Sequence, residues 1–325
     1  MEAWTGTGVL VTGGAGFLGR HLVAALRAAG ALVAAPRRRE YDFTDPRACT
    51  AFFRAHAVDA VVHSAALYGG IWFNRVKPAE IFHQNLVMGA QLMEAARQTG
   101  VGRFVQIGTA CSYPGHLEGD LAEDDLWSGA CHESVECYGL VKRVLEAQGR
   151  VYHAQFGMKT SHLVLTNLYG PFDCYEPERS HVVAALVRKV VEAVDDGVPV
   201  LEAWGTGRPM REFLYVEDAA EAIVRAGLRC DDGRPLNVGT GIGTSIRELL
   251  ELLCDVAGFR GEIRWDPTKP DGTARKVLDV RRMRATLDWS PPTALRDGLA
   301  RTVAWYRANR GRAAVADVER GGARA

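Results

Sequence analysis

Residues 9–19 read Val9-Leu10-Val11-Thr12-Gly13-Gly14-Ala15-Gly16-Phe17-Leu18-Gly19. The first four residues predict a short buried strand, and the apolar positions between Leu22 and Ala29 predict a helix after the glycines. Three glycines between a strand and a helix are typical of a turn that holds a dinucleotide pyrophosphate at the helix N-terminus. An ordinary tight turn is the alternative. The strand before the glycines and the helix after them favour the dinucleotide turn, because a tight turn requires neither. We therefore expect cofactor contacts at Gly13, Gly16, Phe17, Leu18 and Gly19.

The end of the second predicted strand, 31–35, indicates which dinucleotide is bound. It continues into Pro36-Arg37-Arg38-Arg39, where proteins that use NAD usually place an acidic residue on the ribose 2′-hydroxyl. Arginine favours the 2′-phosphate of NADP instead, and a solvated basic turn is the alternative. We predict NADP(H) as the cofactor, with Arg38 at this phosphate and Asp42 at the adenine. Small residues after a third strand place Ala65 beside the ribose, whereas His63 is expected to be a packed strand-end histidine.

The order of predicted elements indicates the fold class. Strands at 60–66, 103–107 and 161–165 alternate with helices at 78–100 and 138–156, which implies an α/β protein with a Rossmann-type, doubly wound parallel sheet. Past residue 171 the alternation loosens, which indicates a smaller C-terminal α/β substrate domain. We expect an NADP-binding domain at 1–171, to which 212–240 returns, a substrate-binding domain at 172–310, and a loose tail at 311–325.

Composition excludes several classes of partner. The 325 residues include 39 basic and 39 acidic side chains, so no overall charge favours nucleic acid or an anionic membrane. No apolar run approaches the roughly 20 residues that a membrane span needs. The seven cysteines form no C-x-x-C pair, which argues against a disulfide framework and against a metal site of the zinc type. We therefore expect a cytoplasmic enzyme without metal.

Tyr138 and Lys142 are four residues apart on one predicted helical face, which brings the ammonium close to the phenol. A phenol has an ordinary pKa of about 10, and a nearby cation lowers the pKa, so that the phenol exchanges protons more readily near neutral pH. Thr109 follows the strand at 103–107 and supplies a hydroxyl. The three residues together predict a catalytic set of a hydroxyl, a tyrosine and a lysine, with an ordinary surface pair as the alternative for Tyr138 and Lys142.

Cys111 lies two residues after Thr109, so in an extended segment both side chains project to the same side. If that side faces a cleft, one small substrate can touch the hydroxyl and the thiol. A small buried hydrophobic residue is the alternative for Cys111.

Five segments along the chain carry a more specific pattern. They are Gly108-Thr109-Ala110-Cys111-Ser112-Tyr113-Pro114, Thr166-Asn167-Leu168-Tyr169-Gly170-Pro171, Ser180-His181-Val182, residues 204–214 with Pro209-Met210-Arg211-Glu212-Phe213-Leu214, and residues 269–276. With the Tyr138 and Lys142 pair, they resemble the GDP-L-fucose synthase family of the extended short-chain dehydrogenases/reductases. That resemblance implies an NADPH-dependent epimerase/reductase that converts GDP-4-keto-6-deoxy-mannose to GDP-L-fucose. It also implies a homodimer in which helices starting near Pro78 and Tyr138 form a four-helix bundle.

The resemblance implies roles for individual residues. Cys111 and His181 match the epimerisation pair, and Thr109, Tyr138 and Lys142 match the reduction set. Tyr138, Lys142, Asn167 and Leu168 are implied as further cofactor contacts. The implied contacts to the nucleotide-sugar substrate are Asn167, Lys189, Trp204, Arg211 and Lys276.

Two segments depart from the family pattern, and both are expected to face the sugar. Leu67-Tyr68 replaces a Lys-Val pair before Gly69, and residues 132–137 differ on the approach to Tyr138. A related sugar such as a heptose, or C4 reduction without epimerisation, is therefore an alternative. An NAD-dependent nucleotide-sugar 4-epimerase and a non-catalytic nucleotide sensor are further alternatives on the same scaffold.

Overall fold

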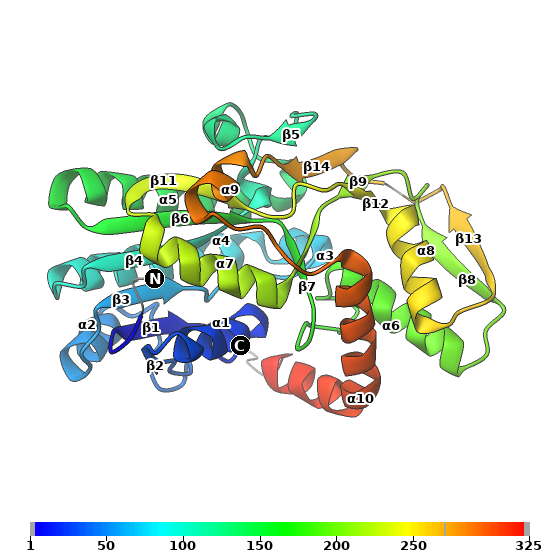
Figure 1. Cartoon of the computed structure of the whole chain (residues 1–325), viewed down its shortest axis with the longest axis horizontal. Coiled ribbons are helices and arrows are strands. Elements are labelled where there is room, and N and C mark those ends of the chain that lie inside the picture. Colours follow the sequence, from blue (N-terminus) through cyan, green and yellow to red (C-terminus); the bar gives the residue numbers. More distant parts are fainter. Residues whose placement is uncertain (1–3, 270, 322–325) are drawn as a thin grey trace.

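The computed structural model describes residues 4–269 and 271–321; residues 1–3, Pro270 and residues 322–325 lie outside the described part. Its largest sheet has six parallel strands in the spatial order β11-β6-β4-β3-β1-β2 (Figure 1). Their bounds are β1 Gly8–Thr12, β2 Leu32–Ala34, β3 Ala60–His63, β4 Arg103–Thr109, β6 Lys159–Leu165 and β11 Asp232–Val238. The predicted parallel sheet is confirmed.

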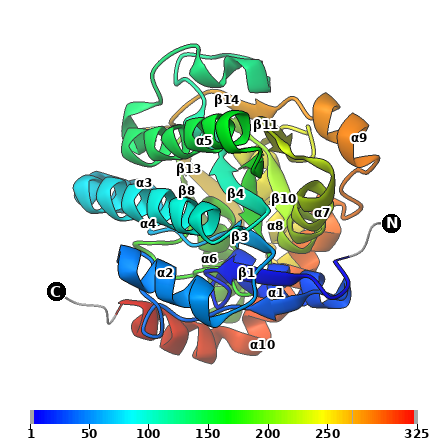
Figure 2. The same cartoon turned by 90° about the vertical axis from the view of Figure 1, so that its left-hand side faces the viewer.

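Helices cover both faces of this sheet, as a parallel sheet requires. Figure 2 shows α2, α4 and α5 on one side of the strands and α1 and α7 on the other. Their bounds are α1 Phe17–Ala28, α2 Pro46–Ala55, α4 Pro78–Gln98, α5 Glu136–Phe156 and α7 Val216–Arg229. The central strands are buried on both faces because of this cover.

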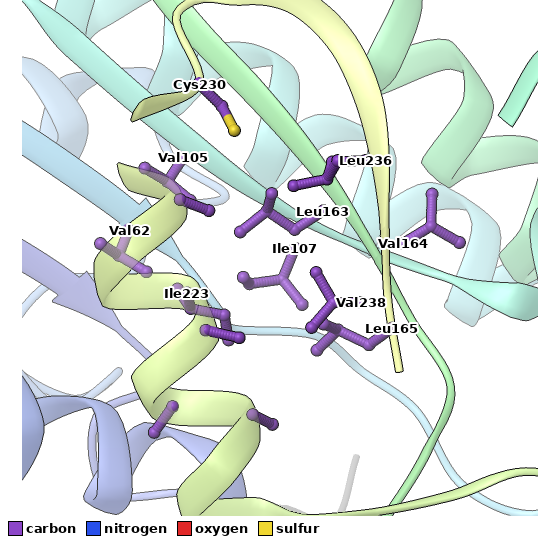
Figure 3. Close-up of a cluster of buried hydrophobic side chains, with 14 of the residues drawn as sticks. Val62, Val105, Ile107, Leu163, Val164, Leu165, Ile223, Cys230, Leu236 and Val238 are labelled. Atoms are coloured by element: carbon purple, nitrogen blue, oxygen red, sulfur yellow. The ribbon is translucent and has the colours of Figure 1, made fainter. Parts of the chain in front are cut away.

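The core between the sheet and α7 is built from strand and helix side chains that are far apart in the sequence. Figure 3 shows Val62, Val105 and Leu163 from three neighbouring strands close to Ile223 of α7. Val238 of β11 belongs to the same cluster. The return of the chain at β11 therefore completes both the sheet and its core.

The strand order reverses next to one edge of the sheet, because β1 lies between the edge strand β2 and β3. The chain leaves β1 toward one edge and then crosses back to β3 on the other side. Ligands of open α/β sheets bind in the crevice at the carboxyl ends of the strands where such a reversal occurs. The fold therefore places a crevice directly at Gly13 and the residues that follow β3.

A second lobe surrounds a separate hydrophobic core, seen at the right of Figure 1. Its main elements are α6 Val182–Asp195, β8 Val200–Trp204, α8 Ile246–Ala257, β13 Glu262–Asp266 and α10 Leu295–Gly321. Shorter elements lie between the lobes or beside the sheet: α3 Ile71–Val76, β5 Asp120–Leu121, β7 Asn167–Tyr169, β9 Met210–Arg211, β10 Phe213–Tyr215, β12 Thr244–Ser245, β14 Arg275–Leu278, α9 Arg281–Leu287, and the 3₁₀ turns Ala110–Ser112, Glu123–Trp127 and Glu133–Val135.

The C-terminal segment differs from the expected loose tail. The backbone of α10 stays helical to Gly321, so residues 311–321 continue the helix, and only 322–325 lie outside the described part. Residues 311–321 include three Ala, two Arg and one Glu, which have high helix propensity and need no apolar period to continue a helix. In residues 4–269 and 271–321, no helix has the length and apolarity that a bilayer span requires.

Glu212 joins the short strands between the lobes. Its side chain is fully buried, and its carboxylate accepts hydrogen bonds from the backbone N–H groups of Thr240, Gly241 at 2.8 Å and Leu278 at 2.7 Å. Burial raises the pKa of Glu212, although these hydrogen bonds lower the pKa in part. One side chain thus connects the β9–β10 segment to the loop after β11 and to β14.

Glu212→Ala is expected to lower the free energy of unfolding by about 3–5 kcal/mol, because three buried N–H groups lose their acceptor. Urea unfolding of the full chain measures the change. The matched control is Glu217→Ala, whose carboxylate is more than half exposed beside Arg301, and it should change the stability by about 0.5 kcal/mol or less. Equal stabilities for the two variants would contradict the structural role of Glu212.

Candidate active site

One cavity of about 610 Å³ runs along the carboxyl ends of the sheet strands and into the second lobe. This volume lies in the range of cofactor and small-molecule sites. Four groups of residues line the cavity: the glycine turn 12–19, the segments 36–38 and 41–44, the segment 64–68, and the side chains of Thr109, Cys111, Tyr138, Asn167, Leu168, Asp173, Arg179, His181 and Lys276. The predicted cofactor turn and the predicted catalytic side chains therefore share one space.

The glycine turn has the geometry of an anion site. Gly13 has φ +69°, in the region that favours glycine, and the Gly16 N–H donates to the Gly13 carbonyl at 2.8 Å. A Cβ on Gly19 would overlap that same carbonyl oxygen, so only glycine lets α1 start this close to β1. Gly16 caps α1 without a side-chain hydrogen bond, which leaves the first N–H groups of the helix for a ligand. The turn fits a dinucleotide pyrophosphate.

The segment directly after β2 is positively charged. It lacks, at residues 36–39, the acidic residue that proteins using NAD usually place there. Pro36, Arg37 and Arg38 line the cavity, and Arg38 Nε donates to Asp42 Oδ2 at 3.1 Å. Burial alone would raise the pKa of Asp42, but hydrogen bonds from Thr44 and Arg38 outweigh it and lower the pKa. Asp42 is thus an anchored carboxylate that holds Arg38 at the cavity. This arrangement fits a ribose 2′-phosphate better than a free 2′-hydroxyl.

The end of β3 packs tightly against the glycine turn. The Ala65 N–H donates to Thr12 Oγ1 at 3.1 Å, and a Cβ on Gly13 would meet the Ala65 Cα at 2.9 Å. His63 is buried, its Nδ1 lies 2.8 Å from Thr12 Oγ1, and burial lowers its pKa to about 3. His63 is therefore a packed strand-end residue, as predicted.

Tyr138 and Lys142 lie near the start of α5 and are both buried. Lys142 Nζ lies 5.5 Å from the centre of the Tyr138 ring. Burial lowers the pKa of Lys142 to about 8, whereas burial, with a smaller effect of Cys111, raises the pKa of Tyr138. Burial removes the phenolate from water and raises the pKa of Tyr138, so the lowering that we expected from Lys142 does not set the pKa of this phenol.

The segment after β4 turns earlier than expected. Thr109 ends the strand, and residues 110–112 form a 3₁₀ turn, so the extended geometry assumed for Thr109 and Cys111 is wrong. Thr109 Oγ1 accepts a hydrogen bond from the Cys111 N–H at 3.2 Å, which stabilises the turn. Both side chains nevertheless line the cavity.

Tyr68 belongs to a segment that we expected to face the sugar, and its side chain lines the cavity beside the predicted catalytic residues. Its ring stacks on Tyr138 with centroids 4.2 Å apart and on His181 with centroids 5.2 Å apart. Its hydroxyl oxygen lies 3.8 Å from Cys111 Sγ. Burial lowers the pKa of His181, which precedes α6. The departure of Leu67-Tyr68 from the family pattern was the sequence signal that could have identified it.

The predicted substrate contacts divide into two groups. Asn167 and Leu168 line the cavity, and Asn167 Nδ2 donates to the Glu212 carbonyl at 3.0 Å. Lys276 also lines the cavity, and the pairing of β14 with β9 places it beside Arg211. Two cations on neighbouring strands suit an anionic group such as a pyrophosphate.

Four predicted residues do not line this cavity: Lys142, Lys189, Trp204 and Arg211. Arg211 Nη1 donates to the carbonyls of Met210 and Thr273, both at 2.7 Å, and burial lowers its pKa. Trp204 is 72% exposed at the end of β8, with Lys269 Nζ 5.7 Å from the centre of its ring. Lys189 lies within α6.

The sequence is similar to known proteins over most of its length. Residues 9–239 match the model of the NAD dependent epimerase/dehydratase family. The chain is 35% identical over 314 residues to the GDP-L-fucose synthase of Escherichia coli (strain K12), and the match covers 94% of this chain and 98% of that protein. The sequence similarity therefore extends through both lobes.

Solved structures share the fold at lower sequence identity. A GDP-6-OMe-4-keto-L-xylo-heptose reductase from C. jejuni has a TM-score of 0.87 at 24% identity, with 94% of this chain and 98% of that chain covered. A GDP-L-fucose synthetase from Naegleria fowleri bound to NADP has a TM-score of 0.85 at 24% identity, with 94% and 96% covered. At this identity the two structures support the fold alone.

Proposed function

This chain belongs to the NAD dependent epimerase/dehydratase family and, within it, to the GDP-L-fucose synthases, and from that membership we propose its reaction. It is an NADPH-dependent epimerase/reductase of a GDP-linked 4-keto-6-deoxy sugar. The substrate is GDP-4-keto-6-deoxy-mannose or a close GDP-sugar variant. Inversion at C3 and C5 and reduction at C4 of that substrate yield GDP-L-fucose.

One observation carries the proposal: a single cavity joins the glycine turn to Thr109, Cys111, Tyr138 and His181. The glycine turn, Arg38, Asp42 and Ala65 hold the cofactor, and Asn167 and Leu168 contact it near the second lobe. Bound NADPH supplies the hydride that reduces C4. We assign the cofactor to residues 1–171 and 212–240, and the sugar nucleotide mainly to residues 172–310.

In the reduction half, Thr109 and Tyr138 hydrogen-bond the C4 oxygen, and Tyr138 gives its proton to this oxygen as C4 becomes an alcohol. Because burial raises the pKa of Tyr138, the phenol carries its proton at neutral pH, and as a weak acid it gives that proton up only when negative charge develops on the C4 oxygen. Lys142, buried behind the phenol, favours the phenolate left by that transfer.

In the epimerisation half, the C4 ketone acidifies the hydrogens at C3 and C5. Cys111 removes such a proton, and protonated His181 returns one from the opposite face, while Thr109 and Tyr138 stabilise the enolate oxygen. One set of hydrogen-bond donors at C4 therefore serves both halves of the reaction.

The nucleotide part of the substrate binds toward β9 and β14. Lys276 and Arg211, adjacent in the register of these strands, bind the pyrophosphate, and Asn167 binds the sugar. Lys189 and Trp204 contact the nucleotide in this proposal. The exposed ring of Trp204 is then free to cover a base.

Incubation of the full chain with GDP-4-keto-6-deoxy-mannose and NADPH, followed by stereochemical analysis of the product, tests the function. The expected product is GDP-L-fucose with one NADPH oxidised per molecule. Absence of NADPH oxidation with this substrate and with GDP-linked 4-keto heptoses would refute the proposal.

A GDP-heptose reductase that does not epimerise is the second candidate. The specific observation in its favour is Tyr68, which replaces a smaller aliphatic side chain of the family pattern in the wall of the cavity. The same product analysis separates the candidates, because this alternative gives a C4 alcohol without inversion at C3 or C5.

The reduction rate is expected to fall as pH rises through about 8, since burial lowers the pKa of Lys142 to about 8 and the lysine then loses its charge. His63 and His162 face Lys142 from the sheet, and burial lowers the pKa of each to about 3, so both stay neutral in this range. A profile of kcat against pH for the wild type and Lys142→Met measures the effect. A wild-type profile without a fall between pH 7 and 9 would contradict the role of Lys142.

We further propose a homodimer formed by α4 and α5, in a cytoplasmic location that the seven free cysteines favour. The outer face of α5 leaves Leu140, Val144 and Val151 exposed at 37%, 38% and 48%. These positions are four and seven residues apart and form one apolar stripe. A second copy of the chain would bury this stripe in a four-helix bundle.

Val144→Glu is expected to convert the dimer to a monomer at micromolar concentration, because two buried carboxylates would face each other across the axis. Sedimentation analysis measures the mass. The control is Glu202→Lys, an exposed charge change on β8 of the second lobe, which should leave the mass unchanged. A wild-type mass equal to one chain would contradict the dimer.

A further inference from the structure

The loop between β3 and α3 holds Tyr68 in a defined position. Before it, Leu67 exchanges two hydrogen bonds with the buried side chain of Asn85, at 2.7 Å to the Leu67 N–H and 2.8 Å to its carbonyl. After it, the buried Asn74 side chain donates to the Gly69 carbonyl at 3.0 Å. The backbone on both sides of Tyr68 is therefore fixed by buried amides, and the side chain enters the cavity from a rigid support.

The Tyr68 ring lies between two predicted catalytic side chains. Its plane is inclined by 27° to the ring of Tyr138 and by 21° to the ring of His181, so the three rings form one stack. The loop also approaches the segment before His181, since a Cβ on Gly70 would meet the Ser180 carbonyl at 3.1 Å. Such a stack limits the rotation of His181 and Tyr138.

The Tyr68 hydroxyl oxygen lies 3.8 Å from Cys111 Sγ, which is within the reach of a hydrogen bond to sulfur. Burial, with smaller effects of Cys111 and Tyr138, raises the pKa of Tyr68 well above its ordinary value. The phenol therefore keeps its proton at neutral pH. Between a protonated phenol and a thiolate, the phenol is the donor, and its hydrogen bond stabilises the negative sulfur.

We propose that Tyr68 is a positioning residue that makes Cys111 the base of the epimerisation pair, an inference that rests on the proposed function. Its hydroxyl donates to the Cys111 sulfur and stabilises the thiolate, and its ring, stacked on His181, holds that imidazole in place.

The proton transfer balances with these groups and solvent water, which protonates His181 before the step and takes the proton from Cys111 before the second carbon reacts. The Cys111 thiolate takes a proton from the carbon next to the C4 ketone, so a C–H bond breaks, an S–H bond forms, and the electron pair moves to the ketone oxygen as an enolate. Protonated His181 then gives its N–H proton to the opposite face of that carbon, and the ketone reforms. Tyr68 keeps its own proton throughout. Only the strength of its hydrogen bond to sulfur changes, because the bond is stronger to the thiolate than to the thiol.

The first test needs no substrate. In Tyr68→Phe, which keeps the ring stack and removes only the hydroxyl, alkylation of Cys111 by iodoacetamide at neutral pH should slow about tenfold. The profile of alkylation rate against pH should also move to higher pH. Mass spectrometry of the Cys111 peptide measures the rate, and Cys111→Ser identifies that peptide. The matched control is Tyr306→Phe, which removes a phenol hydroxyl 3.4 Å from Glu192, outside the cavity, and should alkylate as the wild type does.

The second test separates the two halves of the reaction. Tyr68→Phe should incorporate solvent deuterium at C3 and C5 about tenfold more slowly than the wild type, while reduction of the already epimerised ketone changes less than about twofold. Tyr68→Val, which also removes the ring stack, should slow both halves. NADPH affinity equal to that of the wild type identifies the variants that are folded.

Two alkylation results would overturn the inference. One is unchanged alkylation of Cys111 in folded Tyr68→Phe at every pH. The other is faster alkylation, which would mean that Tyr68 blocks access of the reagent to the thiol. Equal loss of deuterium incorporation and reduction in Tyr68→Phe would also overturn it, because only a general disturbance of the site has that effect. A wild-type protein that turns over no GDP-linked 4-keto sugar would refute the proposed function, whereas the alkylation test would still measure the contact between Tyr68 and Cys111.

Discussion

Tyr138→Phe is expected to lower kcat for C4 reduction by about 10³-fold, because it removes the proton donor to the C4 oxygen and leaves the ring in place. The ring makes the stacking contact with Tyr68 and lies 5.5 Å from Lys142, so the local packing should persist. NADPH oxidation with the GDP-linked 4-keto sugar measures the rate. NADPH affinity, measured by titration of the full chain, should change by less than about threefold.

Tyr306→Phe is again the control, since it removes a phenol hydroxyl from α10 outside the cavity. Its kcat should equal that of the wild type. Turnover by Tyr138→Phe within about tenfold of the wild type would remove Tyr138 from the acid role and would direct attention to Thr109 as the proton donor.

Cys111→Ser is expected to lower the incorporation of solvent deuterium at C3 and C5 by about 100-fold or more. A serine hydroxyl is a far weaker acid than a thiol, whose ordinary pKa is about 8.5, so almost no alkoxide forms to act as a base. Reduction of a substrate that is already epimerised should continue at a similar rate, because the Cys111 thiol contacts the Tyr68 hydroxyl and only the Cys111 backbone N–H contacts Thr109. Deuterium incorporation followed by nuclear magnetic resonance, together with NADPH oxidation, measures the two halves separately.

The matched control is Cys254→Ser, a buried cysteine of the second lobe that does not line the cavity. It should leave both halves of the reaction unchanged apart from a small loss of stability. Deuterium incorporation by Cys111→Ser at the wild-type rate would exclude the thiol from epimerisation and would favour the reductase without epimerisation.

The parts of the site that could be predicted from sequence are those fixed by local geometry. The glycine turn is one of them, because Gly13 has a positive φ and a Cβ on Gly19 would overlap the Gly13 carbonyl oxygen where α1 starts beside β1. The pairing of Tyr138 with Lys142 is another, because four residues make one helical turn. Such features depend on spacing alone, and the structure places them as expected.

Features that depend on solvent could not be predicted in the same way. The spacing of Tyr138 and Lys142 predicts their proximity, but the direction of the pKa shift of the phenol depends on how completely the surrounding elements exclude water. In the folded chain, burial raises the pKa of Tyr138 and lowers that of Lys142, and neither result follows from the local sequence. The 3₁₀ turn at 110–112 could not be predicted either, because it depends on the hydrogen bond from the Cys111 N–H to the Thr109 hydroxyl.

The sequence by itself determined the parallel sheet, the dinucleotide turn and the membership of the family, because periodicity, glycine spacing and extended motifs are properties of neighbouring residues. The tertiary structure decided which side chains meet: it brought Lys276 beside Arg211 through the pairing of β14 with β9, and it placed Tyr68 between Tyr138 and His181. In the sequence, Tyr68 precedes Cys111 by 43 positions and His181 by 113 positions. Contacts across such distances arise only when packing of the two lobes brings separate strands and loops to one edge of the sheet, and spacing along the chain carries no record of them.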